Sequence, residues 1–104
     1  MLLFDFILVP PSFITKPSNQ TTVENEVVAF YCAATGNPVP KITWMKDGEV
    51  VSKEESLSFG AIRSMAGKYW CSVSNGVGAA VNASAHLDVQ CEYENFMIDR
   101  NVYH

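Results

Sequence analysis

The sequence has little charge and few of the residues on which most catalytic, metal and nucleic-acid sites depend. Only 17% of the 104 residues are charged, seven are Lys or Arg, and two are His. The basic residues are scattered and the net charge is −4, which argues against nucleic acid or an anionic membrane as a partner. With 48% hydrophobic and 12% aromatic residues, the composition is that of one packed domain rather than a disordered chain.

Long apolar runs are also missing. A membrane-spanning helix needs about 20 apolar residues, and the most apolar stretch, residues 1–9, is interrupted by Asp5 and ended by Pro10 and Pro11. This stretch makes a poor signal peptide, because it has neither a basic start nor a small-residue cleavage site. We therefore interpret residues 1–10 as a remnant of a preceding module or a boundary segment. A clipped signal or anchor stays open as the alternative, and we expect no direct membrane insertion of this domain.

Helical periodicity is weak throughout, whereas apolar and polar residues alternate in several short runs. These runs are residues 28–34, 41–45, 56–59, 69–74 and 81–89. Turn-forming residues separate them, including two prolines in 36–40, Asp47-Gly48 and Asn75-Gly76. This pattern predicts an all-β sandwich or barrel. We expect antiparallel pairing, because no crossover helices are predicted to connect parallel strands. Within the first run, Ala34 is expected to point inward and Ala33 outward.

Two of the three cysteines lie on the apolar phase of different predicted strands. Cys32 and Cys71 are 39 positions apart and can meet across a sandwich core. Closing a loop of that length would stabilise the fold by roughly 4 kcal/mol on a chain-entropy estimate. The third cysteine, Cys91, is out of phase with the preceding strand. It either forms an interchain or interdomain disulfide or is a free thiol at a truncated boundary, and we favour the second.

The residues around this cysteine pair resemble the immunoglobulin fold. Trp44 follows Cys32 by 12 positions, and Tyr69 precedes Cys71 by two. In that fold a cysteine on strand B and a Tyr-x-Cys on strand F surround a core tryptophan on strand C. The resemblance implies a Cys32–Cys71 disulfide with Trp44 and Tyr69 in one buried cluster. It also implies that the Tyr69 hydroxyl bonds to a backbone group near the E–F corner.

The resemblance extends over most of the chain. Residues 36–48 are similar to the B–C–C′ segment of I-set and C2-set domains, and residues 66–78 to their E–F corner, strand F and F–G turn. The implied fold is a two-sheet antiparallel Greek-key immunoglobulin-like sandwich over residues 11–90. Because the stretch from Trp44 to Leu57 leaves little room for a strand D and none for a C″ strand, we expect an I-set/C2-like domain with a short C′–E connection, not a V-set domain. Residues 91–104 are interpreted as a tail, a truncated linker.

No catalytic or metal-binding constellation is visible in the sequence. His86 lies on the outward phase of its strand, His104 is in the tail, and no Cys-x-x-Cys is present. The paired carboxylates Glu54 and Glu55 are in a polar loop, where a solvated turn is more plausible than acid–base catalysis. We therefore predict that the chain is not an enzyme and that it uses neither a cofactor nor a metal.

The resemblance implies a non-catalytic recognition or adhesion module of a multidomain cell-surface or matrix protein. Its expected partners are proteins, through homophilic or heterophilic receptor contacts, and neighbouring modules of the same chain. Two N-glycosylation sequons, at Asn19 and Asn82, favour an extracellular location. Two alternatives stay open: an intracellular structural module of the muscle-filament type, which shares the I-set pattern, and an immune-type recognition receptor domain.

The outer face of the sheet that carries strands C, F and G is the candidate binding surface. If Trp44 and Cys71 point inward, Met45 and Trp70 must point outward. An exposed Trp is a candidate contact residue, and we add Lys41 of strand C to the candidates. The alternative is local packing, with Trp70 covering Met45 or the stem of Lys41. A glycan on Asn82 would shield the strand-G side and leave contacts to strands C and C′.

Overall fold

The structure is a computed structural model that describes residues 7–91, and nine strands account for most of this range. They are β1 (Val9–Thr15), β2 (Gln20–Val23), β3 (Val27–Tyr31), β4 (Ala33–Asn37), β5 (Lys41–Lys46), β6 (Glu49–Ser52), β7 (Ser56–Gly60), β8 (Gly67–Ser74) and β9 (Val81–Gln90). A single 3₁₀ turn, η2 (Arg63–Met65), is the helical element of the described residues.

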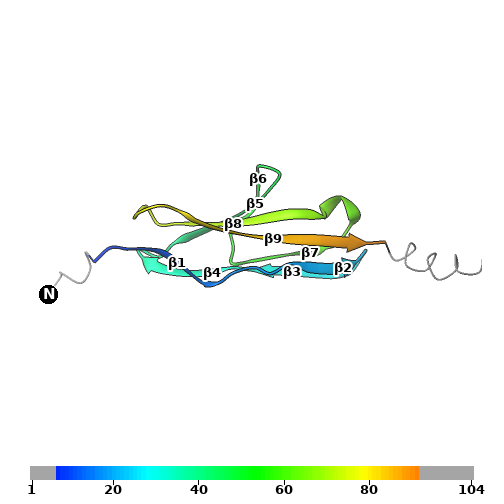
Figure 1. Ribbon diagram of the computed structural model, residues 1–104, viewed down its shortest axis with the longest axis horizontal. Helices are drawn as coiled ribbons and strands as arrows, with labels where there is room; N and C mark the ends of the chain where they lie inside the picture. The colour runs from blue at the N-terminus through cyan, green and yellow to red at the C-terminus, as the bar shows by residue number, and fades with distance from the viewer. Residues whose placement is uncertain (1–6, 92–104) are drawn as a thin grey trace, which may run out of the picture.

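The strands form two layers, which Figure 1 shows with β8 and β9 above β3 and β4. One layer is a five-stranded sheet in the order β2-β9-β8-β5-β6. The other consists of the pairs β1-β4 and β3-β7, which follow each other because only Cys32 separates β3 from β4. The predicted all-β sandwich is confirmed. Buried side chains of both layers fill the space between the sheets, as the period-2 pattern predicts.

One pair of strands contradicts the expectation that all pairing is antiparallel. Strand β2 runs parallel to β9, with Gln20 opposite Leu87 and Val23 opposite Gln90. Parallel neighbours need a long connection, and here almost the whole domain lies between β2 and β9. Residues 16–19, which include Pro17, connect β1 to β2. Through this segment the chain keeps its direction but changes partner, because β1 pairs with β4 in one sheet and β2 pairs with β9 in the other.

The alternation of inward residues continues from β3 through Cys32 into β4, with one exception. Val28, Phe30 and Cys32 are buried, and Ala34 packs against the same core, as predicted. Ala33, which was expected on the outward phase, is nevertheless buried. At this point the chain changes partner, since the Cys32 N–H donates to the Glu55 carbonyl next to β7, after which the chain pairs with β1.

The connection from β6 to β7 is short, as expected. Only residues 53–55 separate these strands, so within residues 7–91 no further strand lies between them. Strand β7 consequently pairs with β3 alone, and β6 pairs with β5 alone, so both strands are edges on the same side of the sandwich.

The first strand begins earlier than the sequence suggests. Val9 is opposite Asn37, so Val9 and Pro10 belong to β1 rather than to a preceding segment. The Asn75 side-chain amide of the β8–β9 loop donates to the carbonyls of Val9 (2.7 Å) and Pro38 (2.9 Å). Pro10 is tolerated because β1 is an edge strand. Residues 1–6 and 92–104 lie outside the described part, and Cys91, partly buried at its end, forms no disulfide with another residue of 7–91.

Candidate functional site

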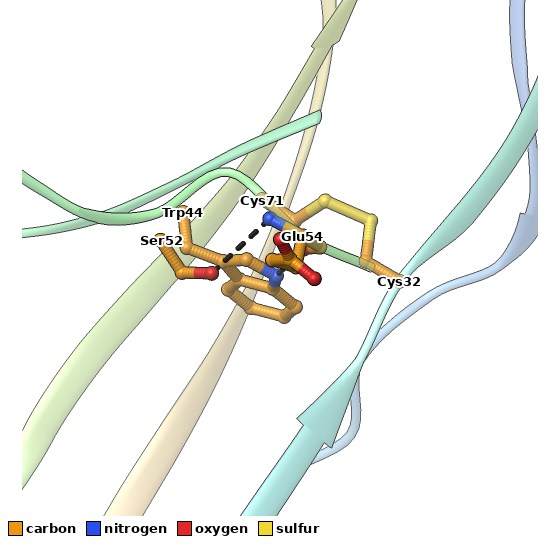
Figure 2. Close-up of a disulfide and its surroundings, with 5 residues drawn as sticks. All are labelled: Cys32, Trp44, Ser52, Glu54 and Cys71. Carbon is orange, nitrogen blue, oxygen red and sulfur yellow. Dashed lines mark hydrogen bonds between the residues drawn. A yellow bond between two sulfur atoms is a disulfide. The ribbon is translucent and has the colours of Figure 1, made fainter. Parts of the chain in front are cut away.

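An inner cluster holds the two sheets together. Cys32, between β3 and β4, is bonded to Cys71 of β8, and the Cα atoms are 6.6 Å apart. The expected disulfide is thus present, and Figure 2 shows the Trp44 ring beside it. Trp44 is fully buried, and its indole N–H donates to the carbonyl of Glu54 at 3.0 Å, which satisfies the only polar atom of the side chain. Phe30, which the sequence analysis did not place in this cluster, has its ring centre 6.0 Å from Trp44.

Tyr69 links this cluster to the turn before β8. Its hydroxyl donates to the carbonyl of Met65 at 2.6 Å, within η2, and its ring packs against Phe30 and Phe59 at 5.2 and 5.7 Å between centres. Burial raises the pKa of the Tyr69 hydroxyl above 10.0, and the nearby Asp47 carboxylate adds to the rise. The hydroxyl is therefore a structural donor that stays protonated at physiological pH.

On the opposite face of the same sheet, three apolar side chains form a row across three strands. Met45 of β5 is opposite Trp70 of β8 on one side and opposite Val50 of β6 on the other. We call Val50, Met45 and Trp70 the outer stripe. Trp70 is 42% exposed, Val50 is 52% exposed and Met45 is half-buried. Met45 and Trp70 are on this face as the alternation in the sequence predicts, but Val50 was not predicted here, because the register of β6 depends on an irregularity in its pairing with β5.

The cation beside Trp70 is not the one considered in the sequence analysis. Lys68 lies over the indole, with Nζ 5.3 Å from the ring centre. Lys41 is instead opposite Ser74, four residues along β5 from Met45 and so about 13 Å away. The suggested packing of Trp70 on the Lys41 stem is therefore wrong. Packing between Trp70 and Met45 remains compatible with the register.

Lys41 lines a hollow on the same face, next to the outer stripe. The hollow has a volume of about 550 Å³. Its floor carries the hydroxyls of Thr43, Ser72 and Ser74, and the loops at 38–39 and 75–76 form its rim. Small neutral side chains therefore surround one cation at the end of the face away from Lys68.

The two sequon asparagines differ in their surroundings. Asn19, in the loop between β1 and β2, is exposed, and its Oδ1 accepts a hydrogen bond of 2.8 Å from the backbone N–H of His86. Asn82 is exposed on β9 directly opposite Ser72, and the sequon hydroxyl of Ser84 is directly opposite Trp70. Asn82 thus lies on the face of the outer stripe, next to the hollow.

Residues 7–91 contain no group of three or more His, Cys, Asp or Glu side chains placed to hold a metal ion. In the same residues, no helix is both long and apolar enough to cross a membrane. Each buried side-chain nitrogen or oxygen in this part of the chain has a hydrogen-bond partner.

Comparisons with known proteins agree with this architecture. A family model described as "Immunoglobulin domain" matches residues 10–75. The chain is 37% identical over 92 residues to the netrin receptor DCC of Rattus norvegicus, covering 80% of this chain and 6% of that receptor's length. A solved structure titled "Tandem Ig repeats of Dlar" has a TM-score of 0.71 and 37% identity, covering 78% of this chain and 48% of that one. The structure of a mutant complex of titin M10 with an obscurin-like 1 Ig domain has a TM-score of 0.75 and 25% identity, covering 82% and 97%.

Proposed function

The chain belongs to the immunoglobulin superfamily, and from this premise we propose that it is a non-catalytic recognition and adhesion module in the extracellular part of a cell-surface or matrix protein. The similarity to a netrin receptor supports this assignment, although the chain spans only 6% of that relative's length. The Cys32–Cys71 disulfide also supports it, since disulfides persist mainly in oxidising compartments.

The proposed module comprises the sandwich up to residue 90, with neighbouring modules of the same parent chain as covalent partners. Strand β1 begins and β9 ends at opposite ends of the long axis, as Figure 1 shows. A module whose first and last strands reach opposite ends can be connected to one neighbour at each end, and a similar solved structure is titled "Tandem Ig repeats of Dlar".

The outer stripe is the observation that carries the proposed binding function. A tryptophan with 42% of its surface exposed on a sheet face can bury a large area in a complex at a low cost in side-chain entropy. Val50 extends the apolar surface across β6, and charged residues of the β5–β6 turn and Lys68 flank it. An apolar centre with a polar rim is the usual anatomy of a protein interface, so the partner is a protein, whether a second copy or a different receptor.

A binding assay with a matched surface control tests this proposal. Trp70→Ser and Tyr31→Ser each remove one exposed aromatic ring, but Tyr31 lies on β3, on the outer face of the other sheet. Both variants are made in the parent protein displayed on cells. The readouts are homotypic cell aggregation and binding of a panel of soluble receptor ectodomains. We expect Trp70→Ser to weaken binding at least tenfold, whereas Tyr31→Ser leaves it unchanged. Equal binding by both variants and the wild type would exclude the outer stripe as the contact.

An intracellular structural role is the second candidate, because the titin complex resembles this fold closely. In a reducing compartment the two cysteines would be thiols. Mass spectrometry of native protein under non-reducing conditions separates the candidates. A Cys32–Cys71 bond with sugar on Asn19 or Asn82 supports the extracellular role, and free thiols without sugar would contradict it.

A further inference from the structure

The sequon at Asn82 is positioned so that a sugar attached to it would lie on the face of the outer stripe. Asn82 is opposite Ser72, and Trp70 is the next outward residue along β8. Diagonal neighbours on adjacent antiparallel strands have Cβ atoms about 7–8 Å apart, a distance that aromatic and long side chains can bridge. A sugar ring on Asn82 Nδ2 therefore comes within contact range of the Trp70 indole.

The surface beyond Ser72 can accommodate further sugar residues. Ser72, Thr43 and Ser74 present short hydroxyl side chains, and the hollow above them has a volume of about 550 Å³. Sugar hydroxyl and acetamido groups both donate and accept hydrogen bonds, as do serine and threonine hydroxyls. A short glycan that extends from Asn82 across β8 would therefore reach these three hydroxyl groups and could occupy the hollow above them.

The side of Trp70 that faces Asn82 is also the side that Lys68 does not approach. Lys68 is opposite His86, so it reaches the indole from the other direction along β8. The face of an aromatic ring carries partial negative charge and attracts weakly positive C–H groups as well as cations. Trp70 can thus hold Lys68 on one flank and the apolar face of a sugar on the other.

We propose that Asn82 carries an N-linked glycan whose first N-acetylglucosamine packs against Trp70 and whose next sugar lies over the hollow. The sugar then covers only the flank of Trp70 that faces Asn82, and it narrows the outer stripe to the remaining surface of Trp70 together with Met45 and Val50. This proposal rests on the proposed extracellular function, because the modification takes place in the secretory pathway. Its effect on the stripe is regulatory, since modified and unmodified chains present different surfaces.

The modification is a group transfer from a lipid-linked pyrophosphoryl oligosaccharide. A bond forms between Nδ2 of Asn82 and C1 of the first N-acetylglucosamine. The bond from C1 to the pyrophosphate oxygen breaks, and the lipid pyrophosphate leaves with that electron pair. The amide nitrogen gives up one proton, and no atom is oxidised or reduced.

Asn19 provides the matched comparison. Asn19, in the loop before β2, is also exposed, but its side-chain oxygen accepts a hydrogen bond from the backbone N–H of His86 on β9. This loop precedes β2, which is next to β9, whereas Trp70 is on β8 and the hollow lies over β8 and β5. Strand β9 therefore separates the Asn19 loop from both. A glycan on Asn19 is therefore expected to leave Trp70 unaffected.

The test uses the full chain secreted from mammalian cells. Peptide mass spectrometry first measures the occupancy of Asn82. Acrylamide quenching of tryptophan fluorescence then compares the glycosylated chain, the chain trimmed to one N-acetylglucosamine, and the Asn82→Asp variant. Because Trp44 is fully buried, quenching reports on Trp70. We expect the quenching constant of both sugar-bearing forms to be about twofold smaller than that of Asn82→Asp, since the sugar covers the flank of the ring that Lys68 leaves accessible.

Two controls decide the interpretation. Asn19→Asp should leave the quenching constant unchanged, and adding Trp70→Ser should abolish the difference between the sugar-bearing chain and the Asn82→Asp chain. An unoccupied Asn82 in secreted chain, or equal quenching with and without the sugar, would overturn the proposal. Failure of the proposed function is seen separately, as an intracellular parent protein with free thiols or as binding that Trp70→Ser does not change.

Discussion

The two tryptophans lie on neighbouring strands of one sheet but on opposite faces. Trp44 is opposite Cys71 and fully buried, whereas Trp70 is opposite Met45 and 42% exposed. One residue along each strand therefore separates the inner cluster from the outer stripe. The same residue type serves the stability of the fold on one face and is available for contact on the other.

The two regions differ in how many constraints hold each side chain. Trp44 packs on a disulfide and on Phe30, and its indole N–H is hydrogen-bonded. Trp70 has Met45 opposite it and Lys68 over its ring, and the rest of its exposed surface meets solvent. Substitutions in the inner cluster should consequently destabilise the fold, whereas substitutions in the outer stripe should change binding.

The largest difference is expected between alanine substitutions of the two tryptophans. Trp44→Ala should lower the free energy of unfolding by about 3–5 kcal/mol, because it leaves a large cavity and an unpaired Glu54 carbonyl. Trp70→Ala should lower it by less than about 1 kcal/mol, the size of a cross-strand pair. Urea unfolding followed by circular dichroism measures both. Similar losses in the two variants would show that the faces are not energetically distinct.

Removing the disulfide should have the next largest effect. The double variant Cys32→Ala/Cys71→Ala should lose about 2–4 kcal/mol, because the 39-residue loop gains freedom in the unfolded chain. Cys91→Ala is the matched control and should change the stability by less than about 0.5 kcal/mol. A comparable loss in the control would mean that Cys91 also contributes to the fold.

The Tyr69 hydroxyl should contribute less than the disulfide. Tyr69→Phe leaves the Met65 carbonyl without its side-chain donor and should cost about 1–2 kcal/mol. Tyr31→Phe removes an exposed hydroxyl that bonds Glu55 at 3.3 Å, and we expect a change below about 0.5 kcal/mol. Thermal unfolding of Tyr69→Phe and Tyr31→Phe measures the two losses of stability. Equal losses would argue against a special role for the hydrogen bond between Tyr69 and Met65.

Alkaline pH offers a milder way to probe the same hydroxyl. Because the pKa of Tyr69 is raised above 10.0 in the folded chain, the unfolded chain loses the proton first as the pH rises. The stability from this group is complete below pH 10 and falls as the pH climbs toward the folded-state pKa. Denaturant midpoints measured from pH 8 to 11 should therefore fall more steeply for wild type than for Tyr69→Phe. Parallel curves would contradict the assignment.

The smallest expected effect is the coupling between Lys68 and Trp70. A double-mutant cycle with Lys68→Met and Trp70→Leu should give an interaction free energy of about 0.5–1 kcal/mol, as for an exposed cation–π pair. The cycle Lys41→Met with Trp70→Leu is the control and should give an interaction free energy near zero. Lys41 lies four residues along β5 from Met45, the residue opposite Trp70. Coupling of Lys41 to Trp70 would show that the register differs from the one described.

Local alternation was sufficient to predict which face each residue of β5 and β8 occupies. Successive side chains of a strand point to opposite sides, so Trp44 and Tyr69 inside imply Met45 and Trp70 outside without knowledge of the partners. The cysteine, tryptophan and tyrosine spacing likewise predicted the disulfide and the sandwich. The alternation is visible within a few consecutive residues, and the cysteine, tryptophan and tyrosine spacing is one that the fold family shares.

Contacts between distant segments were decided only by the tertiary structure. The register of β5 against its neighbours placed Val50 in the outer stripe and Lys41 away from it, while Lys68 came to lie over Trp70. The parallel pairing of β2 with β9 follows from the chain changing partners between the two sheets after β1. The sequence by itself determined the period of each strand, because that period is a property of a single extended backbone. Register and partner choice arise only when two strands meet, so the folded structure alone could determine them.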